Sequence, residues 1–411
     1  MSPDRDAFRR SQLAIGALFL LLGFQYASWV SRIPALKARL DLGEAQIGLL
    51  LMTCGVGAAV SFPLVAVLMR RVGSRLLSVL SALALGVVLL ALSVVPDYPL
   101  TLLVLFCDGV AVGCLNVAMN AQGAALEARY RRTTMSRLHA TFSAGSLLAA
   151  LLASGVTAVT DGLLAHFGVA AALLAVLVVA ARPGLLVDEA DADEAKTDEA
   201  KAAEPAPSGR KARRRFALPV AATLWMGLAM VFGTVTEGAM NDWSALYLKD
   251  VVDAGAGLAP MGIAVVSVMM VLARIFADGW RTRFGDGRIV RTGSLLAGAG
   301  LALALLVGGV VPTLLGFACV GLGVAAVTPC VYVAAARQGS DALSLVAAMG
   351  TTGLLAGPAV IGFIADATSL VWGMAAVAAS AAIVSLCALR IGWPAPEPRT
   401  GPGADLAAGP A

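Results

Sequence analysis

The stretch DEADADEAKTDEAKAAEPAPSGRKARRR, residues 188–215, divides this chain into two halves of similar character. It is acidic at its start, basic at its end, and has no apolar face. A segment this polar cannot build a core, so we interpret it as a mobile linker that is at most partly helical. On both sides of it the chain consists largely of apolar runs, each about long enough to cross a bilayer. Two such halves predict a duplicated membrane protein.

Composition supports this class. Of the 411 residues 59% are hydrophobic and 14% are charged, and the mean hydropathy is +0.85. A soluble protein of this length could not cover so much apolar surface with so few charges. No basic stripe interleaves with aromatic residues, so we expect the lipid bilayer as a partner and no nucleic acid.

The apolar runs predict the fold class. We expect an all-α membrane protein with twelve transmembrane helices in two pseudo-symmetric six-helix bundles. The predicted spans are residues 11–31, 45–69, 76–95, 99–125, 138–159, 164–182, 217–248, 258–280, 289–310, 312–335, 342–364 and 369–391. The corresponding domains are an N-terminal bundle, a linker, a C-terminal bundle and a disordered tail, at 1–182, 183–215, 216–391 and 392–411.

The positive charges predict the orientation. With twelve spans both termini lie on one side, and 26 of the 30 Lys and Arg residues fall in segments assigned to that side, among them the segment 274–291. The other side has Arg32, Lys37, Arg39 and Lys249. Because cytoplasmic connections retain Lys and Arg, we predict that both termini are cytoplasmic.

An internal repeat at a spacing near 212 residues relates the two halves. The loop RRVGSR at 70–75 recurs as RTRFGDGR at 281–288, each between the second and third span of its half. The stretch 106–113 likewise parallels 317–323. Matches in the same order at similar spacing favour a duplication.

The exit of the eighth predicted span, RIFADGWRTRFG at 274–285, is similar to the G-x-x-x-D-R/K-x-G-R/K loop of the major facilitator superfamily. An Asp at a helix end can pair with Arg across a short loop, and that pair must break when the bundles rock. The first-half copy has Met69 and no Asp. Ordinary positive-inside charge is the other interpretation. The predicted gating-loop residues are Arg70, Gly73, Arg75, Asp278, Arg281 and Arg283.

Within that superfamily the chain resembles the YbjJ-type bacterial inner-membrane carriers and, more distantly, fucose permease. The resemblance rests on ASWVSRIP at 27–34, GCLNVAMN at 113–120, LHATFSAG at 138–145 and EGAMNDWS at 237–244. It implies a multi-pass protein of the bacterial inner membrane that works by alternating access. Where relatives tend to have an acid in the fourth span, this chain has Asn116.

The predicted solute-binding groups of the first half are amides. Asn116 and Asn120 are four residues apart, so they share one face of the fourth span, and Gln25 lies near the middle of the first. Amides can both donate and accept hydrogen bonds to a polar solute. The alternative is a clamp between helices, with about 0.6–2 kcal/mol per hydrogen bond.

In the second half Glu237 and Asn241 share a face of the seventh span and complete the predicted solute site. An ionised carboxylate in the membrane costs about 2.5–3.5 kcal/mol, so we expect Glu237 to face a wet cavity or to be protonated during part of the cycle. It is the main predicted proton-coupling residue. Asp242 and Asp108, expected nearer the outer surface, and His139, at the start of the fifth span, are the other candidates.

The sequence contains none of the catalytic or metal-binding motifs that we considered. The six cysteines form no C-x-x-C pair, and there are only two histidines. The sequence lacks a Walker G-x-x-x-x-G-K-S/T motif as well as H-E-x-x-H and G-x-S-x-G. We therefore expect no catalytic residue, cofactor or bound metal.

These observations predict a secondary active transporter, acting as a monomer, that moves a small polar solute together with protons into the cell. A proton-driven exporter of amphipathic compounds is the alternative within the class, although the low aromatic content of 6% does not favour it. A receptor-like membrane protein that does not transport is the alternative outside it. The sequence does not identify the solute.

Overall fold

The computed structural model describes residues 3–132, 134–187 and 221–393. The predicted linker at 188–215 and the predicted tail beyond Trp393 lie outside the described residues. Within the described ranges all regular secondary structure is helical.

The first half contains six helices and a short 3-10 turn. They are α1 (Pro3–Val30), α2 (Ile33–Leu40), α3 (Glu44–Val94), α4 (Tyr98–Tyr130), α5 (Met135–Thr157), α6 (Leu163–Ala181) and η1 (Arg182–Gly184). Every predicted span of this half is found as a helix. The short α2, which begins beside Pro34, was not predicted; Pro is tolerated in the first turn of a helix because its missing N–H has no partner there.

The second half repeats this order. Its helices are α8 (Ala221–Asp250), α9 (Met261–Phe284), α10 (Asp286–Val307), α11 (Val310–Val324), α12 (Val327–Ala336), α13 (Ser340–Ala367) and α14 (Leu370–Cys387). The tenth predicted span is interrupted at Ala325 and Ala326, where α11 ends and α12 begins.

A glycine turn at equivalent positions confirms that the halves are related. In the first half the second and third spans run together as α3, which is 51 residues long and bends at Gly73, with φ 72° and ψ 167°. In the second half α9 and α10 are separated by Gly285, with φ 79° and ψ 151°. This backbone region is essentially restricted to glycine. The two glycines are 212 residues apart, which is the predicted repeat spacing.

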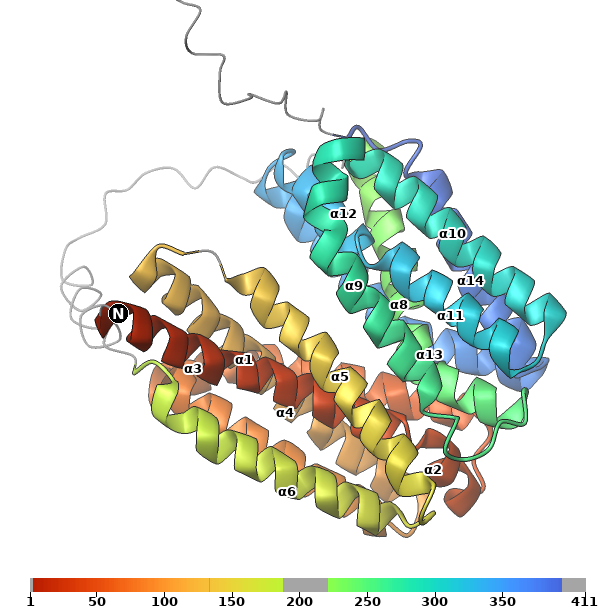
Figure 1. Ribbon diagram of the computed structural model, residues 1–411, viewed down its shortest axis with the longest axis horizontal. Coiled ribbons are helices and arrows are strands. Elements are labelled where there is room, and N and C mark those ends of the chain that lie inside the picture. The colour runs from red at the N-terminus through yellow and green to blue at the C-terminus, as the bar shows by residue number, and fades with distance from the viewer. Residues whose placement is uncertain (1–2, 133, 188–220, 394–411) are drawn as a thin grey trace, which may run out of the picture.

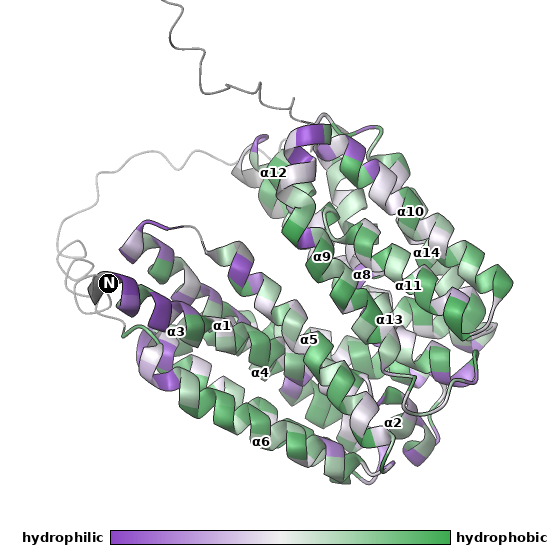
Figure 2. Ribbon diagram, in the orientation of Figure 1, coloured by the Kyte–Doolittle hydropathy of each residue, from purple (hydrophilic) through white to green (hydrophobic). Residues whose placement is uncertain are grey.

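The helices have the length and composition of membrane spans. In the described part of the chain nine helices satisfy both conditions, and one of them, α3, is long enough for two spans. Two further helices, α8 with 30 residues and α9 with 24, are not among these nine, but both exceed the roughly 20 residues that a bilayer requires. Figure 2 shows hydrophobic residues along the helices and hydrophilic residues gathered mainly at their ends.

The two bundles lie at an angle to each other (Figure 1). We call the end that carries the start of α1 and the end of α14 the terminal face, and the end that carries α2 the α2 face. Near the α2 face the bundles touch through backbone: a Cβ added to Gly48 of α3 would lie 2.9 Å from the carbonyl oxygen of Pro358 and 3.2 Å from Cα of Gly362, both in α13. The Ser154 hydroxyl also donates across to the carbonyl oxygen of Gly257.

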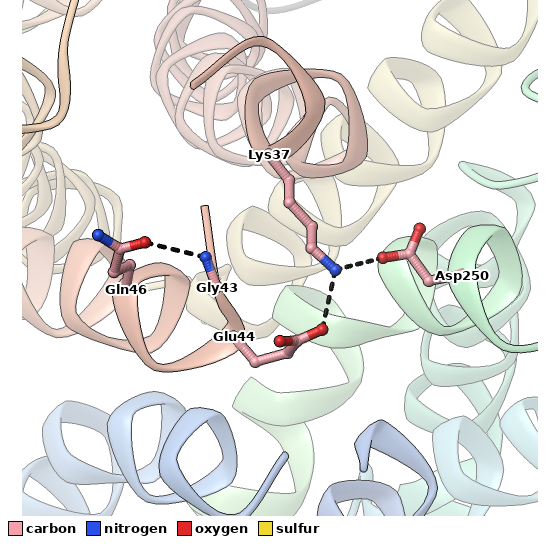
Figure 3. A network of polar contacts seen from close by, with 5 residues as sticks. All are labelled: Lys37, Gly43, Glu44, Gln46 and Asp250. Atoms are coloured by element: carbon pink, nitrogen blue, oxygen red, sulfur yellow. Dashed lines mark hydrogen bonds and ion pairs between the residues drawn. The ribbon is translucent and has the colours of Figure 1, made fainter. Parts of the chain in front are cut away.

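A charged contact joins the bundles at the same face (Figure 3). The ammonium group of Lys37, on α2, lies 2.8 Å from Oε1 of Glu44 and 2.6 Å from Oδ2 of Asp250. Glu44 belongs to the first half, whereas Asp250 is the last residue of α8 in the second. The contacts described so far close the molecule at the α2 face, and the ribbons diverge toward the terminal face (Figure 1).

Candidate transport site

A single arginine bridges the two bundles near the middle of their length. Arg274 lies thirteen residues into α9, about 20 Å from its α2-face end. Its Nη1 donates to the Ser143 hydroxyl of α5 at 2.7 Å, and its Nη2 lies 3.1 Å from Oε1 of Glu237 on α8. The guanidinium therefore contacts a hydroxyl of one half and a carboxylate of the other. Both members of the ion pair are partly exposed, at 31% and 29% of the side chain.

This pair changes the interpretation of Glu237. The sequence argument treated it as a carboxylate without compensation, and that premise is wrong because Arg274 neutralises it. The sequence argument also assigned Arg274 to a charged connection, whereas the structure places it inside α9. The role of Glu237 in proton coupling stays a prediction.

The amide of Gln25 and the carboxylate of Asp108 form a second cluster, within the first bundle. The side-chain nitrogen of Gln25, on α1, donates to Oδ1 of Asp108 on α4 at 2.7 Å. The Cys54 thiol, on α3, lies 3.4 Å from the other carboxylate oxygen. Gln25 and Asp108 are completely buried.

The neighbouring residue of α1 reaches the other bundle. The Tyr26 hydroxyl donates to Oδ1 of Asp242 on α8, and Asp242 is only 3% exposed. Both carboxylates, Asp108 and Asp242, interact electrostatically with Tyr26 and with Cys54. In the described part of the chain neither carboxylate has a basic partner.

Two sequence expectations are corrected here. Asp108 and Asp242 lie toward the α2-face ends of α4 and α8, ten and eight residues from them. The expected hydration is wrong, because both side chains are buried. Gln25 was expected to present its amide to a solute cavity, but it is fully buried and its nitrogen is already bonded to Asp108. Its side-chain oxygen has no hydrogen-bond partner among the described residues.

The two asparagines of α4 share a face, as predicted. The Asn120 side-chain nitrogen donates to both the backbone and the side-chain oxygen of Asn116, each at 2.7 Å. Asn116 is exposed although it lies in the middle of α4. Cys107, nine residues earlier, is also exposed, and at about 100° per residue the two lie on opposite sides of α4. The helix is therefore exposed on two different faces, one at Asn116 and one at Cys107.

The remaining predicted site residues have local partners. The Asn241 side chain donates to the backbone oxygen of Glu237 at 3.1 Å, within α8. The ring of His139 packs edge-on against that of Phe19, with 4.9 Å between centroids. His139 also interacts electrostatically with Arg274, so it lies near the bridge between the bundles.

The predicted gating loops both lie toward the terminal face. In the first-half loop Arg70 is exposed, Gly73 makes the bend in α3, and Arg75 donates to the carbonyl oxygen of Arg182 at 3.0 Å.

The second-half loop holds an ion pair that was not predicted. Arg281 pairs with Asp286 at the start of α10, with 2.8 Å between Nε and Oδ1. The guanidinium of Arg283 lies 5.3 Å from the Phe284 ring centroid. The side chain of Asp278, the predicted partner, lies outside what the structure describes.

Two functional candidates escaped the sequence analysis. Arg274 could have been found as the one charged residue of the apolar stretch 261–277, since a charge inside a span is a functional signal. Tyr26 offered no signal, because a tyrosine in an apolar helix is ordinary. The described residues contain no group of three or more His, Cys, Asp or Glu placed to hold a metal ion.

Two related helical bundles with polar groups buried between them define a membrane protein of the secondary-transporter class. Comparison with known families agrees. The family model of the Major Facilitator Superfamily (MFS) matches residues 13–339, and the chain belongs to this superfamily.

Relatives are similar along most of their length. An uncharacterized MFS-type transporter of Yersinia pestis is 30% identical over 365 residues, covering 87% of this chain and 90% of that protein. An uncharacterized transporter of Sinorhizobium fredii is 31% identical over 379 residues, covering 91% and 96%.

Solved structures share the fold at low sequence identity. A mutant of the nucleoside transporter NupG has a TM-score of 0.71 at 16% identity, over 92% of this chain and 99% of that one. A D-xylose-proton symporter has a TM-score of 0.71 at 14% identity, over 92% and 96%. FucP in its outward conformation has a TM-score of 0.59 at 16% identity, over 93% and 99%. These similarities confirm the predicted fold.

Proposed function

We propose that this protein takes up a small polar solute together with protons, and that Asp242 and Asp108 carry the coupling protons. The observation that supports this most is the placement of these two carboxyl groups. They come from opposite bundles, they are buried, and they bond to adjacent residues of one helix, Tyr26 and Gln25.

Burial without a neighbouring cation favours the protonated form of these carboxyl groups. An ionised carboxylate at such a site costs about 2.5–3.5 kcal/mol, and the cost is relieved by protonation or by water. When the bundles rock, the access of water to the groups between them changes. A carboxyl group that spans the interface, such as Asp242 bonded to Tyr26, links its protonation to that movement.

The solute would bind beside the bridge formed by Arg274. Its ion pair with Glu237 has no net charge and is partly exposed. We assign the amides of Asn116 and Asn120 on α4 to the same proposed site. Such a set suits a neutral solute with several hydroxyl groups, because a guanidinium and a carboxylate can each form two hydrogen bonds with a diol. Structural neighbours named as nucleoside and D-xylose transporters are compatible with this class.

The orientation is part of the proposal. We place the terminal face in the cytoplasm, because the described arginines of the chain connections lie mostly there. On this orientation the contacts at the α2 face close the outer side.

Transport measurements in proteoliposomes test this function. A counterflow screen with radiolabelled pentoses, hexoses and nucleosides would find a transported solute. Asp242→Asn and Asp108→Asn should retain exchange of that solute but lose its accumulation under an imposed pH gradient. Arg274→Gln and Glu237→Gln should instead lose exchange itself, because they remove the solute contacts.

The matched control is Asp253→Asn, the same change at an exposed position near the α2 face. It should keep both exchange and accumulation. Accumulation that survives in both Asp108→Asn and Asp242→Asn would contradict the assignment of the protons. Absence of flux for every solute in the screen would favour the receptor-like alternative, and outward transport of amphipathic dyes would favour the exporter.

A further inference from the structure

A polar cavity opens at the terminal face of the first bundle, apart from every residue assigned to solute or proton. Its volume is about 470 Å³, within the usual range for small-ligand sites. It lies between the start of α1, the end of α4 and the segment that follows η1. Its lining includes Asp6, Arg10, Arg129, Tyr130, Leu185 and Leu186.

The walls of this cavity are fixed by hydrogen bonds and ring contacts. The Gln122 side chain donates to the carbonyl oxygen of Leu186 at 2.9 Å and accepts from its backbone N–H at 2.8 Å. The rings of Phe8 and Tyr130 meet edge-on, with 5.3 Å between centroids, and so join α1 to α4. A ligand would therefore find the site largely formed.

Positive charge dominates the surroundings. Arg10 and Arg129 come from different helices, and neither forms an ion pair with another described residue. The adjoining stretches of α1 and α4 contain further arginines, while the acidic side chains that the structure describes there are Asp6 and Glu127. Glu127 is already occupied, because its Oε1 accepts the backbone N–H groups of Thr134 and Met135.

We infer that this cavity binds a phosphate group, supplied by the headgroup of an anionic phospholipid such as phosphatidylglycerol. Two guanidinium groups from different helices can hold a phosphate through paired hydrogen bonds. Arg10 directly precedes the apolar part of α1 and Arg129 closes α4, so both lie at the depth of lipid headgroups. Asp6 can accept hydrogen bonds from the glycerol hydroxyls. Such a ligand would tie α1 to α4.

The test compares lipid binding by the full chain in lipid nanodiscs and in detergent. The variant carries Arg10→Gln with Arg129→Gln. The matched control carries Arg291→Gln with Arg390→Gln, which removes the same charge from exposed positions at the terminal face of the second half. Native mass spectrometry titrates phosphatidylglycerol, and thermal unfolding reports its stabilising effect. Unchanged melting in phosphatidylcholine shows that both variants fold.

We expect phosphatidylglycerol to bind about 30-fold more weakly to the first variant, since each guanidinium that bonds the phosphate contributes about 1 kcal/mol. The control should change less than 3-fold. Soluble glycerol phosphate that stabilises the wild type, but not the Arg10/Arg129 variant, would support a phosphate site filled from solution. Equal losses in both variants, or equal affinity in the variant and the wild type, would overturn the inference. Neither result depends on the solute transported or on proton coupling.

Discussion

Asp250→Asn should shift the protein toward a state that is open at the α2 face. The substitution keeps the shape of the side chain but removes the charge that holds Lys37 across the two bundles, at 2.6 Å in the structure. The other bond of Lys37, to Glu44 at 2.8 Å, stays within the first half. Glu44→Gln is therefore the matched control, because it removes a charge from the same cluster without cutting the link between the bundles.

The magnitude follows from the exposure of the groups. The side chains of Lys37, Glu44 and Asp250 are 22%, 26% and 32% exposed, so solvent screens the contact considerably. Ion pairs in such positions contribute up to about 1 kcal/mol, which corresponds to a shift of about 5-fold between the two states.

Two members of the cluster, Lys37 and Glu44, have a shifted pKa. Burial acts to lower the pKa of Lys37, but its hydrogen bonds to Asp250 and Glu44 outweigh burial and raise that pKa. The pKa of Glu44 is lowered: burial opposes the shift, but the hydrogen bond from Lys37, a backbone hydrogen bond and the charge of Lys37 together outweigh it. The contribution of Lys37 is thus complete below its ordinary pKa, near 10.4, and that of Glu44 is complete above its ordinary pKa, near 4.3. At pH 7 the contributions of Lys37 and Glu44 are both complete.

Pulsed electron resonance between spin labels can measure the shift. Val159→Cys and Val311→Cys place one label on each bundle near the α2 face, at side chains that are 87% and 67% exposed, in a background with the exposed Cys107 changed to Ser. Asp250→Asn should increase the population of the long distance about 5-fold, and Glu44→Gln should change it less than 2-fold. Equal shifts in the two variants would refute the idea that this contact controls the outer closure.

Three further predictions concern other parts of the chain. Gly73→Ala should reduce the free energy of unfolding by about 1–3 kcal/mol, because only glycine tolerates that backbone conformation, and the melting temperature should fall accordingly. Gly168→Ala is the control: a Cβ there meets open space, so its melting temperature should not fall. The backbone N–H groups of Thr134 and, to a smaller extent, Met135 lower the pKa of Glu127. The stability that this carboxylate provides is therefore complete above about pH 4.3 and is lost as pH falls through the lowered pKa. The difference in melting temperature between wild type and Glu127→Gln should vanish in acid. Ser208→Cys in intact cells should resist an impermeant thiol reagent, and labelling from outside would reverse the proposed orientation.

The helices were predictable because each depends on a local property, the length of an apolar run. The repeat was predictable because it too is visible in short stretches of sequence: Gly73 and Gly285 stand in similar loops. The two predicted spans within α3 are divided by the non-helical Gly73, as the loop at 70–75 predicts. The interruption at Ala325 was not predictable, because a break inside an apolar run depends on packing against other helices. The helix α2 was too short and too polar to register as a span.

The site was predicted less well because it depends on partners that are distant in sequence. Periodicity correctly placed Asn116 and Asn120 on one face of α4, a property of a single helix. It could not reveal that Glu237 meets Arg274, thirty-seven residues later, or that Asp108 meets Gln25. The sequence analysis therefore preferred Glu237 to the two aspartates as the proton-coupling residue. In the structure Glu237 is paired with Arg274, whereas Asp108 and Asp242 have no basic partner among the described residues.

The charged contact at the α2 face and the proposed proton site lie on the same helix. Asp242 and Asp250 are eight residues apart on α8, about 12 Å along its axis, and their partners, Tyr26 and Lys37, lie on α1 and on α2, which directly follows it. Movement of the α2-face end of α8 away from the first bundle must therefore strain both contacts. A proton on Asp242 removes the charge that strengthens its bond to Tyr26, so protonation from outside and release of Lys37 favour the same movement. On the proposed function, Asp250→Asn should consequently make proton entry easier while leaving the carboxyl groups that carry the protons intact.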